Sequence, residues 1–310
     1  MTNALRRLGE LGLIERIRAL AEGTRVAGVR VGIGDDCAVL RVPRGHEMVV
    51  TTDFSLEGRH FRRDWQTAES VGHRCLARGL SDVAAMGAKP LGAFLSLALP
   101  REYELAWVDG FVAGFAELAR RWEVQLAGGD TAQAPGSEIL ADVVVTGSVR
   151  AGRALLRTGA GVGDRIYVTG RLGGAAVELE GMAARVLGGR GRQSFREPRV
   201  GVGLALVRRR LATACMDLSD GLSTDLTHLC RASRVGAELT GVPVAEGATL
   251  EQALHGGEDY ELLFTAARET RVPKRIAGVQ VTDVGKIVAG EGARVDGVEM
   301  KPRGWEHLSG

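Results

Sequence analysis

The chain has 310 residues, of which 45% are hydrophobic and 25% charged, and 40 basic against 38 acidic side chains leave a formal net charge of +2. These values are typical of a globular protein with one large or two ordinary domains, and they exclude a disordered or collagen-like chain. The small net charge excludes a general field that would attract nucleic acid or an anionic membrane, so neither partner is expected.

The first predicted element is an amphipathic helix over residues 1–20, where leucine and isoleucine alternate with charged residues. This pattern differs from a signal peptide. The longest strongly apolar run, residues 91–99, is too short to span a bilayer. The four cysteines form no C-x-x-C pair, so neither structural zinc nor a disulfide scaffold is expected. Together these features favour a cytoplasmic protein.

Short β-branched runs then alternate with longer helical patterns, which predicts a mixed α/β protein. We expect strands at residues 47–52 and 139–146. Helices are expected at residues 68–86 and 105–122, where the apolar residues recur with helical spacing.

A glycine-rich joint at residues 159–164 precedes a further predicted strand at residues 165–169, and the alternation then begins again. We therefore place a boundary near residue 150, which gives two α/β domains over residues 1–150 and 151–310. Residues 187–199 are rich in Gly and Arg and predict a loop.

The most informative residues are aspartates beside strand ends, glycines and small hydroxyl residues. Any one such acid usually caps a turn or faces solvent, but here they form a set: Asp36, Asp53 with its neighbours Thr51 and Thr52, Asp82, Asp130, Asp217 and Asp220. Oxygen ligands without His or Cys partners favour Mg²⁺. Because magnesium commonly takes only one or two protein carboxylates, so large a set predicts several Mg²⁺ ions around a nucleoside triphosphate.

Two observations strengthen this hypothesis. Only four lysines occur, and none lies in a G-x4-G-K-[ST] pattern, so a P-loop nucleotide site is excluded and magnesium would have to neutralise the phosphate charge. Asp82 lies near the end of a predicted helix, where the macrodipole disfavours a negative charge, so a positive partner such as a metal ion is expected beside it.

Ser219, Asp220 and Gly221 precede a helical pattern that begins at Leu222. A serine hydroxyl and the first free amides of a helix can bind an anion, so this segment is predicted to bind a phosphate group. An ordinary helix cap is the alternative, and it is compatible with phosphate binding.

Seven segments carry a resemblance to a known family. They are GIGDDCAVL, TTDFSLEGRHF, LSDVAAMGAKP, LAGGDT, GRALLRTGAGVGDRIYVTG, MDLSDGLSTDL and GGEDYELLF. In this order they resemble the thiamine-monophosphate kinases, members of the superfamily that includes aminoimidazole ribonucleotide synthetase. The resemblance runs from about residue 32 to residue 264, and a Gly-Trp pair near residue 305 extends it.

The resemblance implies a homodimeric enzyme that uses ATP and several Mg²⁺ ions to phosphorylate thiamine monophosphate to thiamine diphosphate. It also implies two α/β domains of the aminoimidazole ribonucleotide synthetase-like type, with the N-terminal sheet pairing across the dimer. Residues 1–150 would carry the metal and ATP phosphate site and the dimer contact. Residues 151–310 would complete the nucleotide and substrate site.

The resemblance further assigns roles to single residues. Metal positions match Asp36, Thr52, Asp53, Asp82, Asp130, Asp217 and Asp220, and Thr51 is included with its neighbour. ATP-contacting positions match Gly129, Asp130, Arg157 and Ser219. Positions that face the thiamine phosphate match His60, Glu258 and Trp305. Asp53, Asp130 and Asp220 are expected to be catalytic, and the cationic thiazolium suits both an aromatic face and a carboxylate.

We expect direct in-line transfer of the γ-phosphoryl group without a covalent enzyme intermediate. Two alternatives stay open: another ATP-using member of the superfamily, such as aminoimidazole ribonucleotide synthetase, and a nucleotide-binding regulator without turnover. A selenide-dependent dikinase would carry a reactive Cys near its N-terminus and a hydrogenase-maturation homologue would end in a Cys, whereas the first cysteine here is Cys37 and the chain ends in Gly310. No complete G-x-G-x-x-G opens a helix, which weakens a dinucleotide-binding interpretation.

Overall fold

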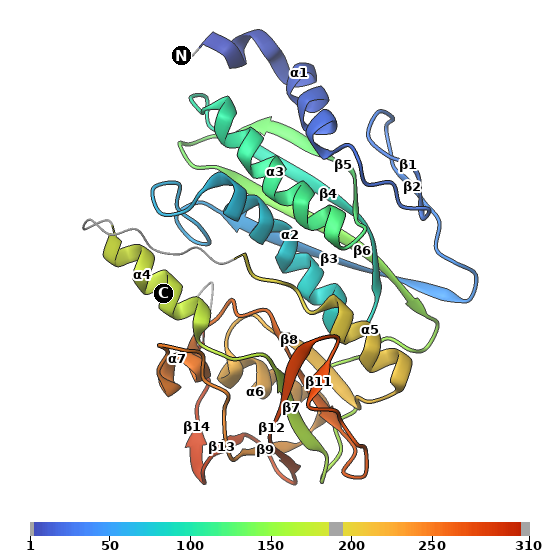
Figure 1. The fold of residues 1–310 in the computed structure, drawn as a ribbon, viewed down its shortest axis with the longest axis vertical. Helices are drawn as coiled ribbons and strands as arrows, with labels where there is room; N and C mark the ends of the chain where they lie inside the picture. The colour runs from blue at the N-terminus through green and yellow to red at the C-terminus, as the bar shows by residue number, and fades with distance from the viewer. Residues whose placement is uncertain (1–2, 186–194, 305–310) are drawn as a thin grey trace. The chain divides into compact units, whose positions relative to one another are not determined.

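A computed structural model describes residues 3–185 and 195–304 and divides the chain into two compact units (Figure 1). Unit 1 comprises Met1–Val83, Lys89–Ala151 and Met182–Arg196, and unit 2 comprises Ala84–Ala88, Gly152–Gly181 and Glu197–Gly310. The two units are therefore not separated at one position in the sequence. Ala84–Ala88 belongs to unit 2 although unit 1 surrounds it in the sequence, and Met182–Arg196 belongs to unit 1 although unit 2 surrounds it. Both units combine helices with a β-sheet, which confirms the predicted mixed α/β class.

Unit 1 is built on a four-stranded sheet. Along the chain its elements are α1 (Asn3–Ala21), β1 (Val29–Val31), β2 (Val39–Leu40), β3 (His46–Leu56), α2 (Ala68–Ala85), β4 (Lys89–Leu99), α3 (Leu105–Arg121), β5 (Gln125–Gln133) and β6 (Leu140–Arg150). The strand order is β3-β6-β4-β5, in which only the β4/β5 pair is parallel. β1 and β2 form a separate antiparallel pair.

The predicted elements of this half are present with different ends. The strands expected at residues 47–52 and 139–146 are β3 and β6, and both are longer than their apolar runs because they pair with each other along their full length. Helices α2 and α3 end one residue before the predicted positions. The helix predicted over residues 1–20 is α1, and Gly9, whose φ of 60° is non-helical, interrupts it.

Helices α2 and α3 cover one face of the sheet (Figure 1). They cross each other at glycines, since a Cβ atom on Gly72 would lie 1.8 Å from the Phe111 carbonyl oxygen and one on Gly114 would lie 1.9 Å from that of Glu69. Gly79 lets α2 approach β6 in the same way. Small residues at these positions allow close contact between backbones. The hydrophobic core of unit 1 therefore lies between this helix pair and the sheet.

Unit 2 is built on a larger sheet of eight strands. Its elements are β7 (Arg165–Thr169), α4 (Gly174–Arg185), α5 (Val200–Arg209), β8 (Ala214–Leu218), α6 (Leu222–Ser233), β9 (Gly236–Leu239), α7 (Leu250–His255), β10 (Glu261–Ala266), β11 (Arg275–Ile276), β12 (Val279–Val288), β13 (Ala293–Val295) and β14 (Val298–Met300). Seven strands follow the order β14-β13-β9-β12-β7-β10-β8, and β11 pairs with β12. Only β13 and β9 pair in parallel.

The core of unit 2 is formed by α6 and the strands that it covers. Leu226 and Leu229 of α6 are fully buried in one cluster with Val168 of β7 and Leu263 of β10. Strand β7 and the first residue of α6 lie where the sequence predicts them. Of the loop predicted at residues 187–199, residues 195–199 form no regular element, and residues 187–194 lie outside the described part of the chain.

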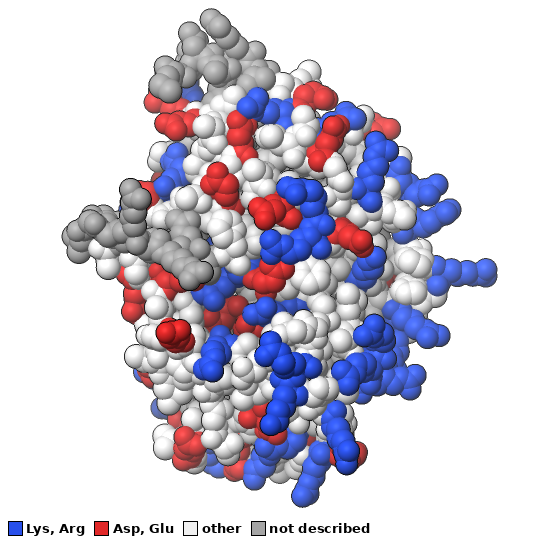
Figure 2. Space-filling view, in the orientation of Figure 1, with Lys and Arg blue, Asp and Glu red and all other residues white. Residues whose placement is uncertain are grey.

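Charged side chains of both signs occur on the face shown in Figure 2. This mixture agrees with the near balance of 40 basic and 38 acidic residues. Over residues 3–185 and 195–304, no helix has both the length and the apolar character that a membrane crossing requires.

Candidate functional site

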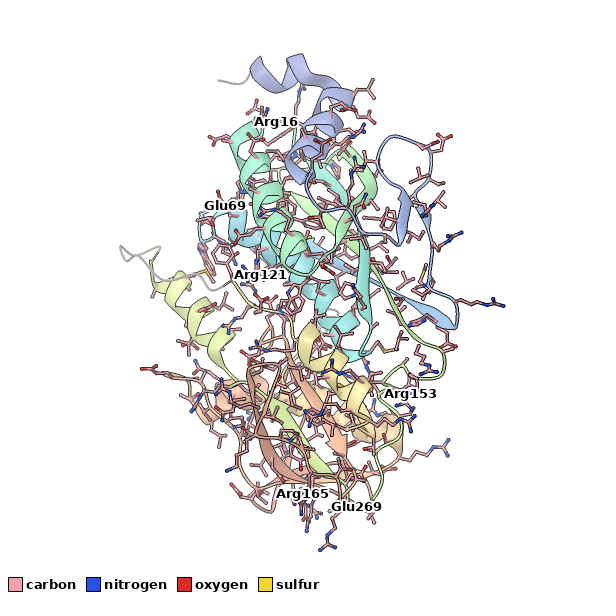
Figure 3. The ribbon with its side chains drawn as sticks, turned by 45° about the vertical axis from the view of Figure 1, so that its right-hand side comes forward. Arg16, Glu69, Arg121, Arg153, Arg165 and Glu269 are labelled. Atoms are coloured by element: carbon pink, nitrogen blue, oxygen red, sulfur yellow. The ribbon has the colours of Figure 1, made fainter. Side chains whose placement is uncertain are left out.

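Unit 1 contains a cavity of about 900 Å³. Its walls come from the loop of residues 33–38 before β2, from the facing parts of β4 and β5, and from α1. Helix α1 is held by Arg16, whose guanidinium donates to both carboxylate oxygens of Asp109 in α3 at 2.5 and 2.6 Å (Figure 3). The bidentate ion pair fixes α1 as one wall of the cavity.

Three carboxylates line this cavity: Asp35, Asp36 and Asp130. All three residues are exposed, and the Asp36 amide donates to Asp35 Oδ1 at 2.9 Å. Gly129 lies beside them with a φ of 151°, and a Cβ atom there would be 1.8 Å from the Leu95 carbonyl oxygen. Glycine is therefore required where β5 approaches β4. The structure thus brings the predicted residues Asp36, Gly129 and Asp130 together.

A second polar group lies along β3. The Thr51 hydroxyl donates to Asp82 of α2, and the Thr52 hydroxyl donates to Asp142 of β6 at 2.8 Å. Because successive strand residues face opposite sides of a sheet, Thr51 and Asp53 lie on the side of α2 and Thr52 lies on the other side. Asp82 therefore accepts a hydrogen bond from a neutral hydroxyl, and the positive partner expected from its helix position stays a prediction.

Asp53 and Asp130 lie on opposite edge strands of the same sheet. Asp53 is opposite Val143, Val143 is opposite Leu95, and Leu95 is opposite Gly129, so the two acids are about three strand spacings apart. At about 4.8 Å for each spacing, the separation is roughly 14 Å. One metal ion therefore cannot bind both carboxylates of the same chain.

His60 lies in the turn that follows β3. Its Nδ1 accepts a hydrogen bond from the Leu56 amide at 3.0 Å, and its own amide donates to the Leu56 carbonyl oxygen at 2.8 Å. A ring nitrogen that accepts from an N–H carries no proton, so the His60 proton lies on Nε2. The turn thus orients the imidazole in one tautomer, with a hydrogen-bond donor at Nε2.

The four cysteines are free thiols. Burial is the main cause that raises the pKa of Cys75 to about 12, while a hydrogen bond with Ser55 and the charge of Arg78 act in the opposite sense. Burial also raises the pKa of Cys230 to about 11. Because the thiolate is the reactive form, these buried side chains are poor nucleophiles.

In unit 2, two loops bring Ser219, Asp220 and Glu258 together. The Glu258 amide donates to the Ser219 carbonyl oxygen at 2.8 Å, and the Tyr260 amide donates to that of Leu218 at 3.0 Å. Asp217 is the penultimate residue of β8, directly before this loop, and is buried. Glu258, which follows β8 by about 40 residues, is therefore placed beside the phosphate-binding segment predicted at Ser219.

Asp225, which sequence reasoning missed, organises the same loop. Its Oδ2 accepts the amides of Asp220 and Gly221, each at 3.1 Å. Burial first, and then the charges of Asp217 and Asp220, raise the pKa of Asp225 to about 8, while the hydrogen bonds from the two amides act in the opposite sense. The amides of Asp220 and Gly221 are therefore occupied, and the anion site expected at the Ser219 hydroxyl and the first free amides of the helix stays a prediction. The sequence signal for Asp225 was an acid in the first turn of the predicted helix, where a carboxylate can accept hydrogen bonds from the backbone amides of the helix N-terminus.

The segment around Glu258 is strained and held by its neighbour Asp259. Glu258 and Tyr260 have φ values of 62° and 50°, which non-glycine residues rarely adopt. The buried Asp259 carboxylate accepts the amides of Gly173 and Ala175 at 2.6 and 3.1 Å, at the start of α4. Such a fixed contact can maintain the unusual backbone on either side of it.

Two predicted residues are not brought into this group. The Arg157 carbonyl oxygen accepts the Ser233 hydroxyl at the C-terminal end of α6, whereas Ser219 precedes the other end of that helix, so their shared role in binding ATP stays a prediction. Trp305 lies outside the described residues. The last described residue, Gly304, has no room for a side chain, since a Cβ atom there would be 2.1 Å from the Asp220 carbonyl oxygen.

Among the described residues, no group of three or more His, Cys, Asp and Glu side chains is arranged to hold a metal ion. The predicted metal positions instead form smaller groups: Asp36 and Asp130 at the cavity, Thr51 with Asp82 on the side of β3 that also carries Asp53, and Asp217 with Asp220 near Asp225. Magnesium commonly takes one or two protein carboxylates and completes its shell with water and phosphate oxygens. Groups of this size and of oxygen donors only therefore fit magnesium.

The chain has the domain organisation of the AIR synthase related proteins. Residues 34–149 match the model for the AIR synthase related protein, N-terminal domain, and residues 161–298 match that for the C-terminal domain. These two matches place the cavity acids in the first domain and the Ser219 and Glu258 loops in the second.

Individual relatives of this chain identify its family within the AIR synthase related proteins. The thiamine-monophosphate kinase of Salmonella typhimurium is 38% identical over 303 residues, which cover 91% of this chain and 91% of that protein. The crystal structure of thiamine-monophosphate kinase from Stenotrophomonas maltophilia K279a has a TM-score of 0.76 and 35% identity, and the match covers 93% of this chain and 96% of that chain. A structure of AaThiL complexed with AMPPCP and TMP has a TM-score of 0.75 and 31% identity over 98% of both chains. The chain therefore belongs to the thiamine-monophosphate kinase family of enzymes.

Proposed function

We propose that this chain transfers the γ-phosphoryl group of ATP to the phosphate of thiamine monophosphate, giving thiamine diphosphate and ADP. The observation that carries this proposal is the cavity of about 900 Å³ lined by Asp36, Gly129 and Asp130. Acidic oxygens beside a glycine-lined wall suit a nucleotide phosphate that arrives with magnesium. The complex of the related AaThiL with AMPPCP and TMP supports the choice of substrates.

The carboxylates have one shared role in this proposal. Mg²⁺ bound by them would neutralise phosphate charge and stabilise the charge that develops during transfer. In unit 1, Asp36 and Asp130 would hold one ion and the acids beside β3 another, and in unit 2 Asp217 and Asp220 would hold a further ion. The chain's own part is positioning, because Gly129 brings β5 close to β4 and Asp225 fixes the loop that carries Asp220.

The acceptor requires little further chemistry from the protein. A phosphate monoester is already ionised near neutral pH, so no strong general base is needed. The Nε2–H of His60 is a suitable donor to its oxygens, and the Glu258 carboxylate complements the cationic thiazolium. Because positioning and charge neutralisation suffice for phosphoryl transfer, direct in-line transfer accounts for the reaction without a covalent enzyme intermediate.

A homodimer is part of the same proposal. Along β3, alternate residues leave a row of apolar side chains exposed: Met48 at 41%, Val50 at 61% and Phe54 at 62%. An apolar sheet face of this kind is typical of a protein contact, and a second copy of the chain would cover it. A second copy would also add its own edge strands. Asp53 of one copy could then lie near Asp130 of the other, although the two acids of one chain are roughly 14 Å apart.

The test is a product assay with ATP labelled at the γ-phosphate. With magnesium and thiamine monophosphate, label should move to thiamine diphosphate with release of one equivalent of ADP. Thiamine is the matched control, because it carries the same thiazolium without the accepting phosphate, and it should give no labelled product. Without acceptor, the protein should stay unlabelled. Label bound to the protein would contradict direct transfer, and ADP release independent of thiamine monophosphate would contradict the acceptor.

A further inference from the structure

The segment that follows β14 is tied to α6 and α7 by side chains to which the proposed reaction assigns no role. The Arg303 guanidinium forms an ion pair with Glu251 of α7 at 2.6 Å. The Arg303 amide donates to Ser223 Oγ at 3.4 Å, and the Gly304 amide donates to Thr224 Oγ1 at 3.0 Å. These contacts place Gly304 against the Asp220 carbonyl oxygen, within the loop of the proposed phosphate site.

His255 lies between these contacts and joins them. Its Nδ1 is 2.8 Å from Ser223 Oγ, and its Nε2 is 3.1 Å from an Arg303 guanidinium nitrogen. A guanidinium can only donate, so Nε2 must accept, and the single ring proton must lie on Nδ1 and be donated to Ser223. The observed geometry therefore requires neutral His255.

We propose that His255 and Arg303 are positioning residues that hold the segment of residues 303–304 beside the Asp220 loop, and that protonation of His255 releases this segment. A proton on Nε2 would face the Arg303 guanidinium, which removes the hydrogen bond and opposes two positive charges. Gly304 is followed by Trp305, so release would weaken the acceptor contact. Only this last consequence rests on the proposed function.

The charged groups that face His255 come from three directions. Arg303 approaches from the C-terminal segment, Glu251 from α7 at 3.7 Å, and α6 contributes the neutral Ser223 hydroxyl. Burial lowers the pKa of His255 below its ordinary value of 6.5, and Arg303 lowers it further, while Glu251 acts in the opposite sense. Glu251 does not reverse this balance, because its closest contact is to Arg303.

The sign of the pH effect follows from this direction. In the held state the lowered pKa of His255 keeps the ring neutral, whereas in the released state the ring takes up a proton once the pH falls below about 6.5. Release is therefore favoured as the pH falls below that value, and holding is favoured above it. For one titrating group, the step from pH 7.5 to pH 5.5 can change the equilibrium by at most about ten-fold.

Amide hydrogen exchange of the full-length protein without substrates tests the release directly. Protection of the Arg303 and Gly304 amides, taken relative to the unfolded chain at each pH, should fall several-fold between pH 7.5 and pH 5.5. The variant His255→Gln keeps a neutral side chain with a donor and an acceptor, so its protection should not change with pH. His228→Gln is the matched control, since His228 is exposed on α6 and should leave the pH response intact.

Equal protection of the parent at both pH values would overturn the proposal, as would an unchanged response in His255→Gln. If His255→Gln fails to fold, His255→Asn replaces it and retains an uncharged donor and acceptor. These outcomes do not depend on which acceptor the enzyme uses.

Steady-state kinetics at pH 7.5 then tests whether the contacts of Arg303 also affect binding of the proposed acceptor. Arg303→Met should raise the KM for thiamine monophosphate about five-fold or more with little change in the KM for ATP, since it removes charge-assisted bonds on the acceptor side only. Arg294→Met, at an exposed position of β13, should leave both constants unchanged. If exchange responds as expected while neither KM changes, the holding contact stands and the acceptor role of the C-terminal segment is wrong.

Discussion

The two units treat their acidic side chains in opposite ways. In unit 1, Asp36 and Asp130 are exposed at the wall of a large cavity. In unit 2, Asp225, Asp259 and Glu261 have exposed fractions of 1%, 5% and 4%, and each accepts hydrogen bonds from the protein. Both kinds occur in glycine-flanked motifs, so the residue type alone does not reveal the role. Exposure and partners do, because an acid whose oxygens are already occupied has less to offer a ligand.

Glu261 is the clearest case of the second kind. Arg199 donates to both of its carboxylate oxygens, one of them at 2.6 Å, and the Thr169 hydroxyl donates at 2.5 Å. Gly170 leaves the space for this contact, since a Cβ atom there would be 2.0 Å from the carboxylate. Buried charges of this kind are tolerated only when fully paired. Glu261 therefore holds β7, β10 and the start of α5 together.

The largest effect is expected where a proposed magnesium ligand is neutralised. Asp130→Asn and Asp53→Asn should each lower kcat by at least two to three orders of magnitude, because each removes a proposed magnesium ligand and several kcal/mol of charge stabilisation. The melting temperature should change little, since Asp130 is exposed and asparagine keeps the shape. Steady-state kinetics in excess magnesium, paired with thermal unfolding, measures both.

Asp296→Asn is the matched control for these variants. Asp296 is exposed in the turn between β13 and β14, where its φ of 48° is one that asparagine accepts readily. It should keep parental kcat. Near-parental turnover of Asp130→Asn would show that the cavity acids do not take part in the reaction, and the contrast between the two units would lose its functional meaning.

A buried acid should show the reverse pattern, with stability affected more than chemistry. Arg199→Met leaves the Glu261 carboxylate buried without its cation and should lower the free energy of unfolding by about 3 kcal/mol. The double variant Arg199→Met/Glu261→Gln should recover part of this loss, because no charge is then left unpaired. Urea unfolding measures all three proteins.

Lys286→Met supplies the exposed counterpart. It removes an ion pair with Glu238 at 3.0 Å between side chains that are 50% and 39% exposed, and should cost less than about 1 kcal/mol. If Arg199→Met costs no more than this control, Glu261 does not depend on its pairing, and burial is a poor guide to the role of these acids.

The sequence predicted four of the helices and three of the strands, and it left the other described elements unassigned. Hydrophobic periodicity located α2, α3, β7 and the start of α6, because each of these elements buries one regular face. Strand ends were less accurate, since pairing extends β3 and β6 beyond their apolar residues. The motifs containing Asp36 and Asp130 both line one cavity, whereas the metal-binding role expected of them stays a prediction.

Other features depend on register and packing, which spacing in the sequence does not specify. The distance between Asp53 and Asp130 follows from a strand order in which two strands separate them. The occupied amides beside Ser219 follow from the position of Asp225 one helical turn later. The strained backbone at Glu258 depends on contacts of Asp259 with a segment more than 80 residues earlier. A motif can therefore name the residues of a site before it can say which of them meet.

The smallest effect is expected on the acceptor side, where Glu258 belongs to neither class of acid: it is half-buried, on a strained backbone, beside Ser219. If its carboxylate and the face of Trp305 both contact the thiazolium, Trp305→Ala should weaken thiamine monophosphate binding by roughly 0.5 to 2 kcal/mol, the range of a cation–π contact. Glu258→Gln should weaken it by a similar amount, because it keeps the shape and removes the charge. The affinity for an ATP analogue should stay unchanged in both variants, and calorimetric titration with each ligand measures the difference. Trp122→Ala would be a poor control for Trp305→Ala, because Trp122 caps α3. Glu246→Gln, in the loop before α7, is the control for the loss of charge in Glu258→Gln. Parental binding of thiamine monophosphate by Trp305→Ala would make the terminal aromatic a structural residue and leave Glu258 as the sole proposed contact to the cation.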